Sequence, residues 1–447
     1  MSMLKKRYGF SVEDLQEELG ESGDEGIVPG SDDQLIDFDE SDMHEKDDSD
    51  VIEEAMDQVA DVSEGLEAIQ ETMLAALSDG GMTKQSSLFA TLAIQGIVGK
   101  WMDTDSVMPG MESFDDADGR MTATGYALEG IGEMLSNLWK RIKAFIKKWY
   151  KAACAFLQRM SFTAKGYAAS AEKLIKLAKA KKGHKPKDAT LEIAKGIANE
   201  LSISGTFDPE KATEAAITLL KKSAGQAKGT SDMVADVIEV FSKLDLAVDA
   251  DVADAAHLAS GASFKSAVAG MGAGKKTASG DSFKATADTA YFEVNPGMPG
   301  SSVCIMELNG KKDVFVGMRV TAVHFKKWDH LDAVDQKASD ISGVVRLATD
   351  AKNVFNAIVD ADKNADAMQK SADKAINKMD RLSAEADKIK GKGNKAASAA
   401  IRSMISASGG SLTSALQIDA ITNRQAFATG KAAYAVAKQH YNNLTKD

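Results

Sequence analysis

The stretch that decides the fold is Leu128–Met160, LEGIGEMLSNLWKRIKAFIKKWYKAACAFLQRM. Its large apolar residues recur at intervals of three and four, as they do on one face of an α-helix. Lysines and arginines fill much of the remaining surface. The spacing therefore predicts a long amphipathic helix whose apolar stripe comprises Leu135, Leu138, Trp139, Ile142, Phe145, Ile146, Trp149, Ala153, Phe156, Leu157 and Met160.

Further helices are expected on both sides of this stretch. Aromatic residues make up 6% of the chain and there are only 6 prolines, while alanine, which carries the lowest helix penalty, is abundant. Before the stretch, helical spacing of apolar residues predicts helices over 51–77 and 87–101. After it, helices are predicted over 162–182, 188–201, 208–223, 231–242 and from 329 to about 445, with breaks near 391–393 and 406–411.

One part of the chain carries a β pattern. Val303–Leu308 and Val314–Phe325 are rich in β-branched and aromatic residues and flank Asn309-Gly310, a pair typical of hairpin turns. Tyr291–Val294 is a candidate third strand. Residues 12–50 are too acidic and too poor in apolar residues to offset the entropy of ordering, so we expect them to be disordered.

The predicted fold is therefore mainly α: an Ala-rich helical bundle with a small β-hairpin insertion at about 290–325 and a disordered acidic N-terminal arm. The predicted divisions are an acidic segment at 1–112 (disordered, then helical), a helical bundle with the basic amphipathic helix at 113–258, a Gly/Ser-rich linker at 259–282, the hairpin element at 283–328, and Ala-rich helices at 329–447.

Charge is distributed unevenly along the chain. The net charge is −12, but residues 1–112 hold 28 acidic and 6 basic side chains, a net of −22. The remainder holds 54 − 6 = 48 basic and 66 − 28 = 38 acidic residues, a net of +10. Between Met134 and Lys187 there are 15 basic residues and one acidic residue, Glu172. Opposite blocks attract, so the acidic arm is expected to screen the basic segment from polyanions; the alternative is a solubilising tail.

Two strings resemble ligand loops but lack necessary residues. GMGAGKKT at 270–277 has Ala269 where a phosphate loop needs its first glycine, and Lys276 where it needs a hydroxyl. DADKNADAMQKS at 360–371 has Ala365 and Ser371 in place of the glycine and glutamate of a calcium loop. A solvated helix face is the expected structure there.

A third cluster, HFKKWDHLD at 324–332, brings His324 and His330 close in sequence but matches no familiar zinc spacing. Neither cysteine, Cys154 or Cys304, has a neighbouring histidine, and two cysteines make no disulfide framework. We therefore predict no metal, no cofactor and no enzymatic activity. An enzyme with a site around the 303–325 hairpin is the alternative that a bound metal at these histidines would favour.

The chain shows no export or membrane-spanning pattern. The basic start MSMLKKRYGF is followed by no apolar core of a signal peptide. The longest apolar run, 88–99, is shorter than the roughly 20 residues that span a bilayer. A soluble protein is expected.

The charge division and its joint resemble a known family. Internal head proteins of large tailed bacteriophages carry acidic propeptides, which a prohead protease removes after a glutamate that has a small or aliphatic residue two positions before it. Gly110, Met111, Glu112 and Ser113 resemble such a site, in the Pro/Gly/Asp-rich joint where the charge changes sign. The same pattern occurs at Ser11–Glu13, Ala127–Glu129, Ser170–Glu172 and Ala198–Glu200. After the joint, a short acidic lead and a Trp/Lys helix are similar to the mature start of these proteins.

The resemblance implies a virion structural protein of the head interior or prohead core, present in the host cytoplasm during assembly. Its expected partners are capsid or other prohead core proteins, the maturation protease and packaged double-stranded DNA, bound without sequence preference. The alternative is a membrane-active helical effector or ejected protein that binds anionic membranes through the basic helix. The residues expected to contact DNA or a partner are Lys140, Arg141, Lys143, Lys147, Lys148, Lys151, Lys173, Lys176, Lys179, Lys181, Lys182, Lys185 and Lys187.

Overall fold

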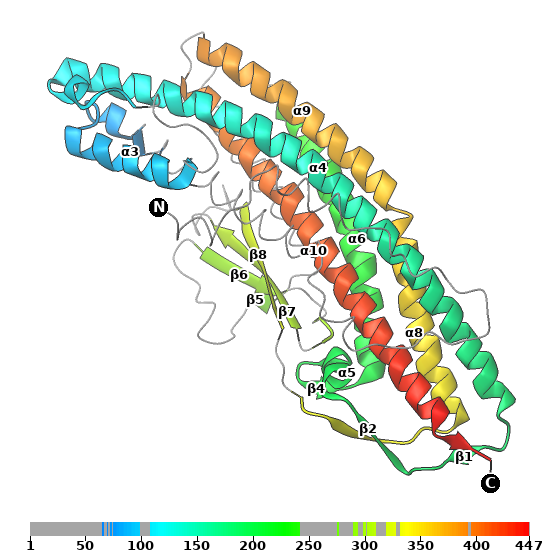
Figure 1. Ribbon diagram of the computed structural model, residues 1–447. Coiled ribbons are helices and arrows are strands. Elements are labelled where there is room, and N and C mark those ends of the chain that lie inside the picture. The colour runs from blue at the N-terminus through cyan, green and yellow to red at the C-terminus, as the bar shows by residue number, and fades with distance from the viewer. Residues whose placement is uncertain are drawn as a thin grey trace, which may run out of the picture.

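The computed structural model shows an elongated helical molecule with a small sheet on one side (Figure 1). The structure describes residues 65–66, 69, 72–73, 75–98, 108–241, 275–276, 289–293, 298–300, 302–309, 319–327, 331–391 and 395–446. The predicted acidic arm at 12–50 lies outside these residues. The predicted mainly α fold with a small antiparallel β element is confirmed.

Within the described ranges, four long helical arms form the bundle. They are α4 (Ala117–Ala180), α6 (Pro209–Phe241), α8 (Ile341–Asp362) followed in the same direction by α9 (Ala365–Gly391), and α10 (Lys395–Asn442). The arms α4 and α10 run in one direction, and α6 and α8–α9 run in the other (Figure 1). Helix α10 contacts all the other arms, so most of its described side chains between 411 and 440 are buried.

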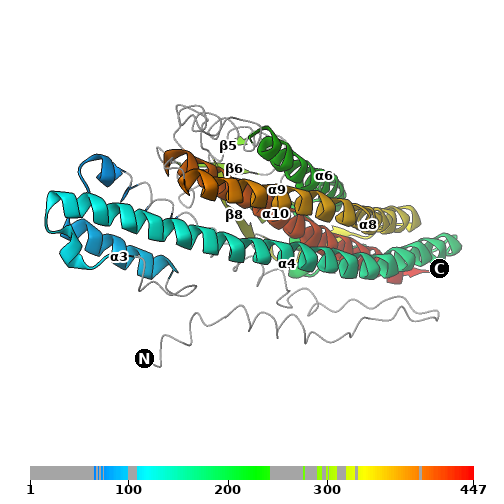
Figure 2. The ribbon, with the colours of Figure 1, turned by 90° about the horizontal axis from the view of Figure 1, so that it is seen from above.

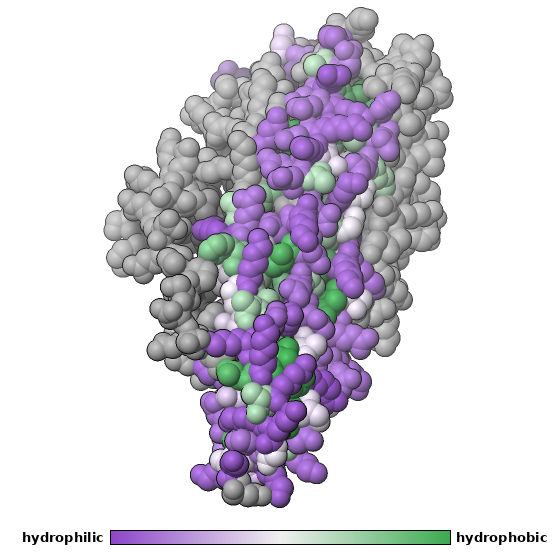
Figure 3. Space-filling model, turned by 90° about the vertical axis from the view of Figure 1, so that its right-hand side faces the viewer, coloured by the Kyte–Doolittle hydropathy of each residue, from purple (hydrophilic) through white to green (hydrophobic). Residues whose placement is uncertain are grey.

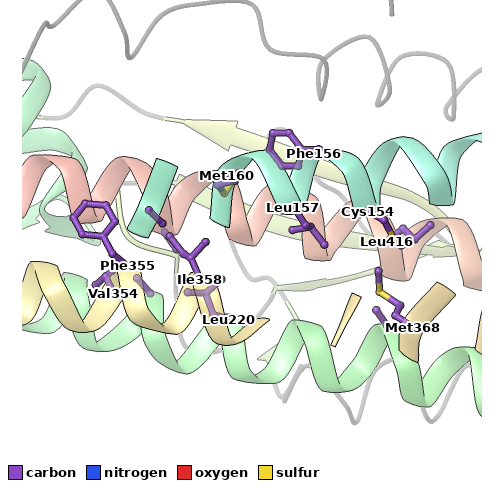
Figure 4. Close-up of a cluster of buried hydrophobic side chains, with 14 of the residues drawn as sticks. Cys154, Phe156, Leu157, Met160, Leu220, Val354, Phe355, Ile358, Met368 and Leu416 are labelled. Atoms are coloured by element: carbon purple, nitrogen blue, oxygen red, sulfur yellow. The ribbon is translucent and has the colours of Figure 1, made fainter. Parts of the chain in front are cut away.

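The main core lies between these arms (Figure 4). Leu157 and Met160 of α4 face Leu220 of α6 and Ile358 of α8, while Leu416 comes from α10. Aromatic rings add to this core, because Phe355 stacks on Tyr167 at a centroid distance of 5.2 Å. The apolar stripe expected from residue 154 onward is therefore a packing surface; the stripe side chains between 132 and 153 lie outside the description.

The sheet consists of four antiparallel strands in the order β5 (Lys275–Lys276), β6 (Thr289–Glu293), β7 (Ser302–Asn309) and β8 (Arg319–Lys327). Strand β8 packs against α10. The third strand predicted at 291–294 is confirmed as β6. Asn309, predicted to begin the turn, is instead the last residue of β7 and pairs with Arg319, and Gly310 lies outside the described residues.

Polar contacts fix this sheet to the bundle through Gly300. Its amide donates to the carbonyl of Ser202, and an added Cβ would lie 2.2 Å from Nε2 of Gln425. The side-chain amide of Gln425 in turn donates a hydrogen bond to Oε2 of buried Glu200 at 2.6 Å. With φ at +81°, Gly300 also has a backbone conformation that side chains disfavour. A side chain at position 300 would therefore have to displace the Gln425 amide and adopt a backbone conformation that it disfavours.

Short strands connect segments that are distant in sequence at the opposite end of the bundle. Strand β1 (Lys185–Pro186) pairs with β10 (Leu444–Thr445), and β2 (Thr190–Ile193) pairs with β9 (Val334–Lys337). The strands β3 (Ser202–Ile203) and β4 (Thr206–Phe207) form a small hairpin. The helix predicted over 188–201 is therefore wrong: β2 is followed by the short helix α5 (Lys195–Glu200).

Other predicted breaks are also corrected. The helices expected at 128–160 and 162–182 are one helix, α4, and those at 208–223 and 231–242 are one helix, α6. Helix α10 continues through 406–411, where a break was expected. Lys275 and Lys276, assigned to a linker, form β5. The proposed domain limits themselves stay a prediction.

A second, smaller core lies at the far end of α4, which extends beyond the bundle (Figures 1 and 2). Here α3 (Lys84–Val98) lies beside the first turns of α4, and the described residues between 65 and 78 are helical. The predicted helix at 87–101 is thus confirmed as far as Val98, the last described residue of that range, with a start three residues earlier. We call residues 65–98 and 108–131 together the N-terminal lobe. Its cluster of buried side chains comprises Leu66, Met73, Met82, Ile94, Phe114, Ala123, Ala127, Leu128 and Ile131.

Candidate cleavage site and basic surface

The predicted cleavage residues lie at the corner between α3 and α4. Gly110 has an extended conformation (φ −58°, ψ 147°), and Met111–Phe114 form one turn of 3-10 helix, η2. The Ser113 amide donates to the carbonyl of Gly110 at 2.9 Å. Met111, Glu112 and Ser113 are exposed, and the next residue, Phe114, is buried at 2% exposure. The corner is thus accessible, and Phe114, the second residue after the Glu112–Ser113 bond, attaches it to the lobe core.

Local contacts explain why the chain turns here. Asp116 caps α4, since its side chain accepts a hydrogen bond from the Gly119 amide at 2.6 Å. Lys84, the first residue of α3, pairs with Asp115 across the corner. The hydroxyl of Ser87 lies 3.6 Å from the sulfur of Met111. These contacts come from both sides of the proposed cut.

Three of the four other small-x-Glu sequences named above lie in the described part of the chain, and all three are in α-helices. Ala127 and Leu128 are buried inside α4, and Ala171 is fully buried further along the same helix. Ala198–Glu200 lies in α5, with all three residues buried. Ser11–Glu13 lies outside the described residues.

The basic residues fall into two groups, one in the middle of α4 and one at its C-terminal end. Lys140, Arg141, Lys143, Lys147, Lys148 and Lys151 all belong to α4, but Lys147 alone among them has a described side chain; its Nζ lies 3.4 Å from Oδ1 of Asn377. The role of residues 140–151 as a binding face therefore stays a prediction.

The second group, Lys173–Lys187, lies at the end of α4 far from the cleavage site. Lys179, Lys182 and Lys187 are exposed. Along α4, roughly 90 Å separates Lys179 from the first turn at a rise of 1.5 Å per residue. The described part of the N-terminal lobe is therefore remote from these lysines, and its acidic residues do not screen them directly.

Lys181 and Lys176 of this group have structural partners that explain their positions. Lys181 donates to the carbonyls of Tyr441 and Leu444 at 3.1 and 3.0 Å and lies 4.0 Å above the Tyr441 ring. Partial burial lowers its pKa. Lys176 pairs with Glu172 at 3.1 Å, and Lys352 pairs with the same carboxylate. Hydrogen bonds from Lys176 and then Lys352 lower the pKa of Glu172. Sequence spacing alone does not distinguish these lysines from the exposed ones.

The face that carries α4, α8 and α9 is mostly hydrophilic (Figure 3), and its hydrophobic areas are small and separate. Six of the seven large hydrophobic residues with high exposure in the described chain lie instead in the N-terminal lobe: Leu88, Phe89, Leu92, Met111, Met121 and Tyr126. Among the described helices, none is both long and apolar enough to cross a membrane.

The strings that resembled ligand loops take other structures. In the sheet, Lys275 pairs with Glu293 and Lys276 pairs with Phe292. Asp360 is in the last turn of α8, where it pairs with Lys363 at 2.6 Å, and Ala365 begins α9. His324 belongs to β8, and His330 lies outside the described residues. Within the described ranges, no three metal-binding side chains gather in one place.

Fold and site together define an extended helical protein, in which an exposed corner joins an acidic N-terminal lobe to a basic helix. The family of phiKZ-like phage internal head proteins matches residues 36–438, which is most of the chain, so the chain belongs to that family. The protein is therefore a structural component of the phage head interior and associates with other head proteins. No curated protein and no solved structure matches the chain.

Proposed function

We propose that this internal head protein is made as a precursor, is cut by the prohead protease after Glu112, and contacts packaged DNA through its basic surface. The observation that carries the proposal is the exposure of Glu112 in a single 3-10 turn. The three other small-x-Glu sequences considered above, at 127–129, 170–172 and 198–200, are held in α-helices. A protease binds an extended chain, and one isolated turn opens at a lower cost than a helix interior. In this role the protein acts without catalysis of its own.

The test is the N-terminal sequence and intact mass of the protein from purified phage particles. A chain that begins at Ser113 is the expected result. A chain that begins near Met1, or at the residue after another glutamate, would contradict cleavage at this corner. Glu112→Gln should leave the particle-associated protein uncut, whereas Glu129→Gln, a change within α4, should leave processing intact.

The exposed lysines at the end of α4 support the DNA contact. Lys179, Lys182 and Lys187 are exposed, and no acidic partner is described for them. Lysines that bind phosphates release the counterions of the DNA, which favours association. Reversal of these three charges to glutamate should weaken retention on DNA at moderate salt and reduce the slope of affinity against salt by about three. Reversal of Lys370 and Lys374, exposed on α9, is the control for reversal of Lys179 and Lys182 alone, because both variants change the charge by the same amount. Equal effects of both variants would contradict a localised DNA surface.

A further inference from the structure

The core of the N-terminal lobe is divided by the proposed cut. Leu66, Met73, Met82 and Ile94 come from the N-terminal side, and each has at most 3% of its surface exposed. They pack against Phe114, Ala127 and Ile131 on the C-terminal side, and the latter two are fully buried. Neither set has another described apolar cluster to join. Each side therefore covers the apolar surface of the other, as two subunits do in an interface.

Backbone contacts make the fit specific. The Met82 amide donates to Oγ1 of Thr124 at 2.8 Å in a buried setting, and the Thr124 hydroxyl donates to the Arg120 carbonyl at 2.7 Å. An added Cβ on Gly81 would lie 2.5 Å from the carbonyl carbon of Arg120. Gly81 also has a φ of +94°. The turn before α3 is thus held directly against the first turns of α4.

We infer that the first turns of α4, with η2, form a docking site for residues 65–98, and that this segment stays bound there after the chain is cut. The biological setting of this inference rests on the proposed cleavage after Glu112. Hydrolysis of the Glu112–Ser113 bond consumes one water and leaves a carboxylate on Glu112 and an ammonium group on Ser113. Both atoms of that bond belong to exposed residues, so hydrolysis removes none of the buried contacts.

This docking changes what maturation does. The net of −22 carried by residues 1–112 stays with the complex, because the new carboxylate and ammonium charges cancel. The cut chain keeps the net charge of −12 until the two pieces separate. Separation, through a further cut within 65–98 or through displacement, is therefore the step that gives the protein its positive charge.

The experiment cuts the full chain at an engineered position and asks whether the pieces stay together. A recognition sequence for a site-specific protease is inserted between Pro109 and Gly110, where an added Cβ on Gly110 meets no atom within 4 Å. The cut protein is then passed over a size-exclusion column in physiological buffer and in 1 M NaCl. We expect the two pieces to co-elute in both. Separation in physiological buffer would overturn the inference. Separation in high salt alone would also overturn it, since charge attraction would then hold the arm.

Two variants of α3 locate the contact. Ile94→Asp places a charge on the buried face and should release the fragment; Leu92→Asp makes the same change at a residue that is 55% exposed and should not. The same behaviour in both variants would overturn the assignment of this face. Uncut Ile94→Asp protein is the folding control, because the main core lacks residue 94 and should keep its helical content. Natural processing at Glu112 plays no part in this experiment, so its result is independent of the proposed function.

Discussion

At the scale of single residues, Asp419 is the clearest case of a group whose protonation is set by the fold. It lies on the central helix α10 with 3% of its surface exposed, and its carboxylate accepts a hydrogen bond from Ser223 of α6 at 2.7 Å. Burial raises the pKa of Asp419 to about 6, and the hydrogen bond from Ser223 opposes this rise. The protonated form is therefore favoured in the folded chain over a pH range where the unfolded chain ionises.

This pKa shift gives a stability change with a definite sign. Between about pH 4, the ordinary value, and about pH 6, the folded chain holds a proton that the unfolded chain has released. The contribution of Asp419 to stability is thus present below pH 4 and lost as pH rises through 6. Asp419→Asn should raise the free energy of unfolding more at pH 7.5 than at pH 4. The difference between the two effects should be on the order of 2 kcal/mol. Urea unfolding at both values checks this, with exposed Asp332→Asn as the control; a gain that is equal at both pH values would contradict it.

At the scale of elements, the C-terminal strand β10 packs against the end of α4 and stabilises it. Leu444 is 2% exposed and packs with Ala178 of α4 and Val344 of α8. Its carbonyl accepts from Lys181. Deletion of residues 443–447 should therefore lower the free energy of unfolding by roughly 2–4 kcal/mol, through the lost apolar burial and hydrogen bonds. Deletion of 446–447, which keeps β10, is the control in thermal unfolding. Equal losses of stability from both deletions would show that β10 contributes nothing to the free energy of unfolding.

Elements with a strong local pattern were predictable from sequence, and those made by distant pairing were not. The apolar spacing of 128–160 identified α4, and the β-rich run at 303–308 identified β7. Residues 188–201 also have helical spacing, but Thr190–Ile193 pairs with Val334–Lys337, about 140 residues away, and this pairing overrides local propensity. Helix α10 continues through Ser408 and Gly409 because both are buried, where small residues let helices approach closely.

The candidate site was predictable only in part, for the same reason. Pro109-Gly110 and the change of charge pointed to an exposed corner, and Glu112 is exposed there. The contact of 65–98 with α4 was not predictable, because helical spacing shows which face is apolar but not which surface covers it. Likewise, Lys181 and Lys179 are indistinguishable by spacing, although one is bound to α10 residues and the other is exposed.

At the scale of the whole molecule, the two larger clusters of buried side chains that the structure describes are a main core and a separate lobe core, joined along α4. The main core draws on α4, α6, α8, α9 and α10, whereas the lobe core has nine buried residues. A small core buries less apolar surface per residue, so the lobe should open at a lower free energy than the bundle. Opening of the lobe would also free the corner around Glu112 for a protease.

We therefore expect calorimetry of the uncut protein to show two transitions, with the lobe unfolding first. Phe114→Ala, at 2% exposure in the lobe, should lower or remove the first transition and leave the second in place, and Phe355→Ala, fully buried against Tyr167, should lower the second. Each truncation costs about 3–5 kcal/mol in its own core, because a large ring leaves a cavity. A single transition that both variants shift alike would mean that α4 transmits folding between the two cores as one cooperative unit. In that case the lobe would not open by itself, and a protease would have to act on the exposed 3-10 turn of the folded lobe.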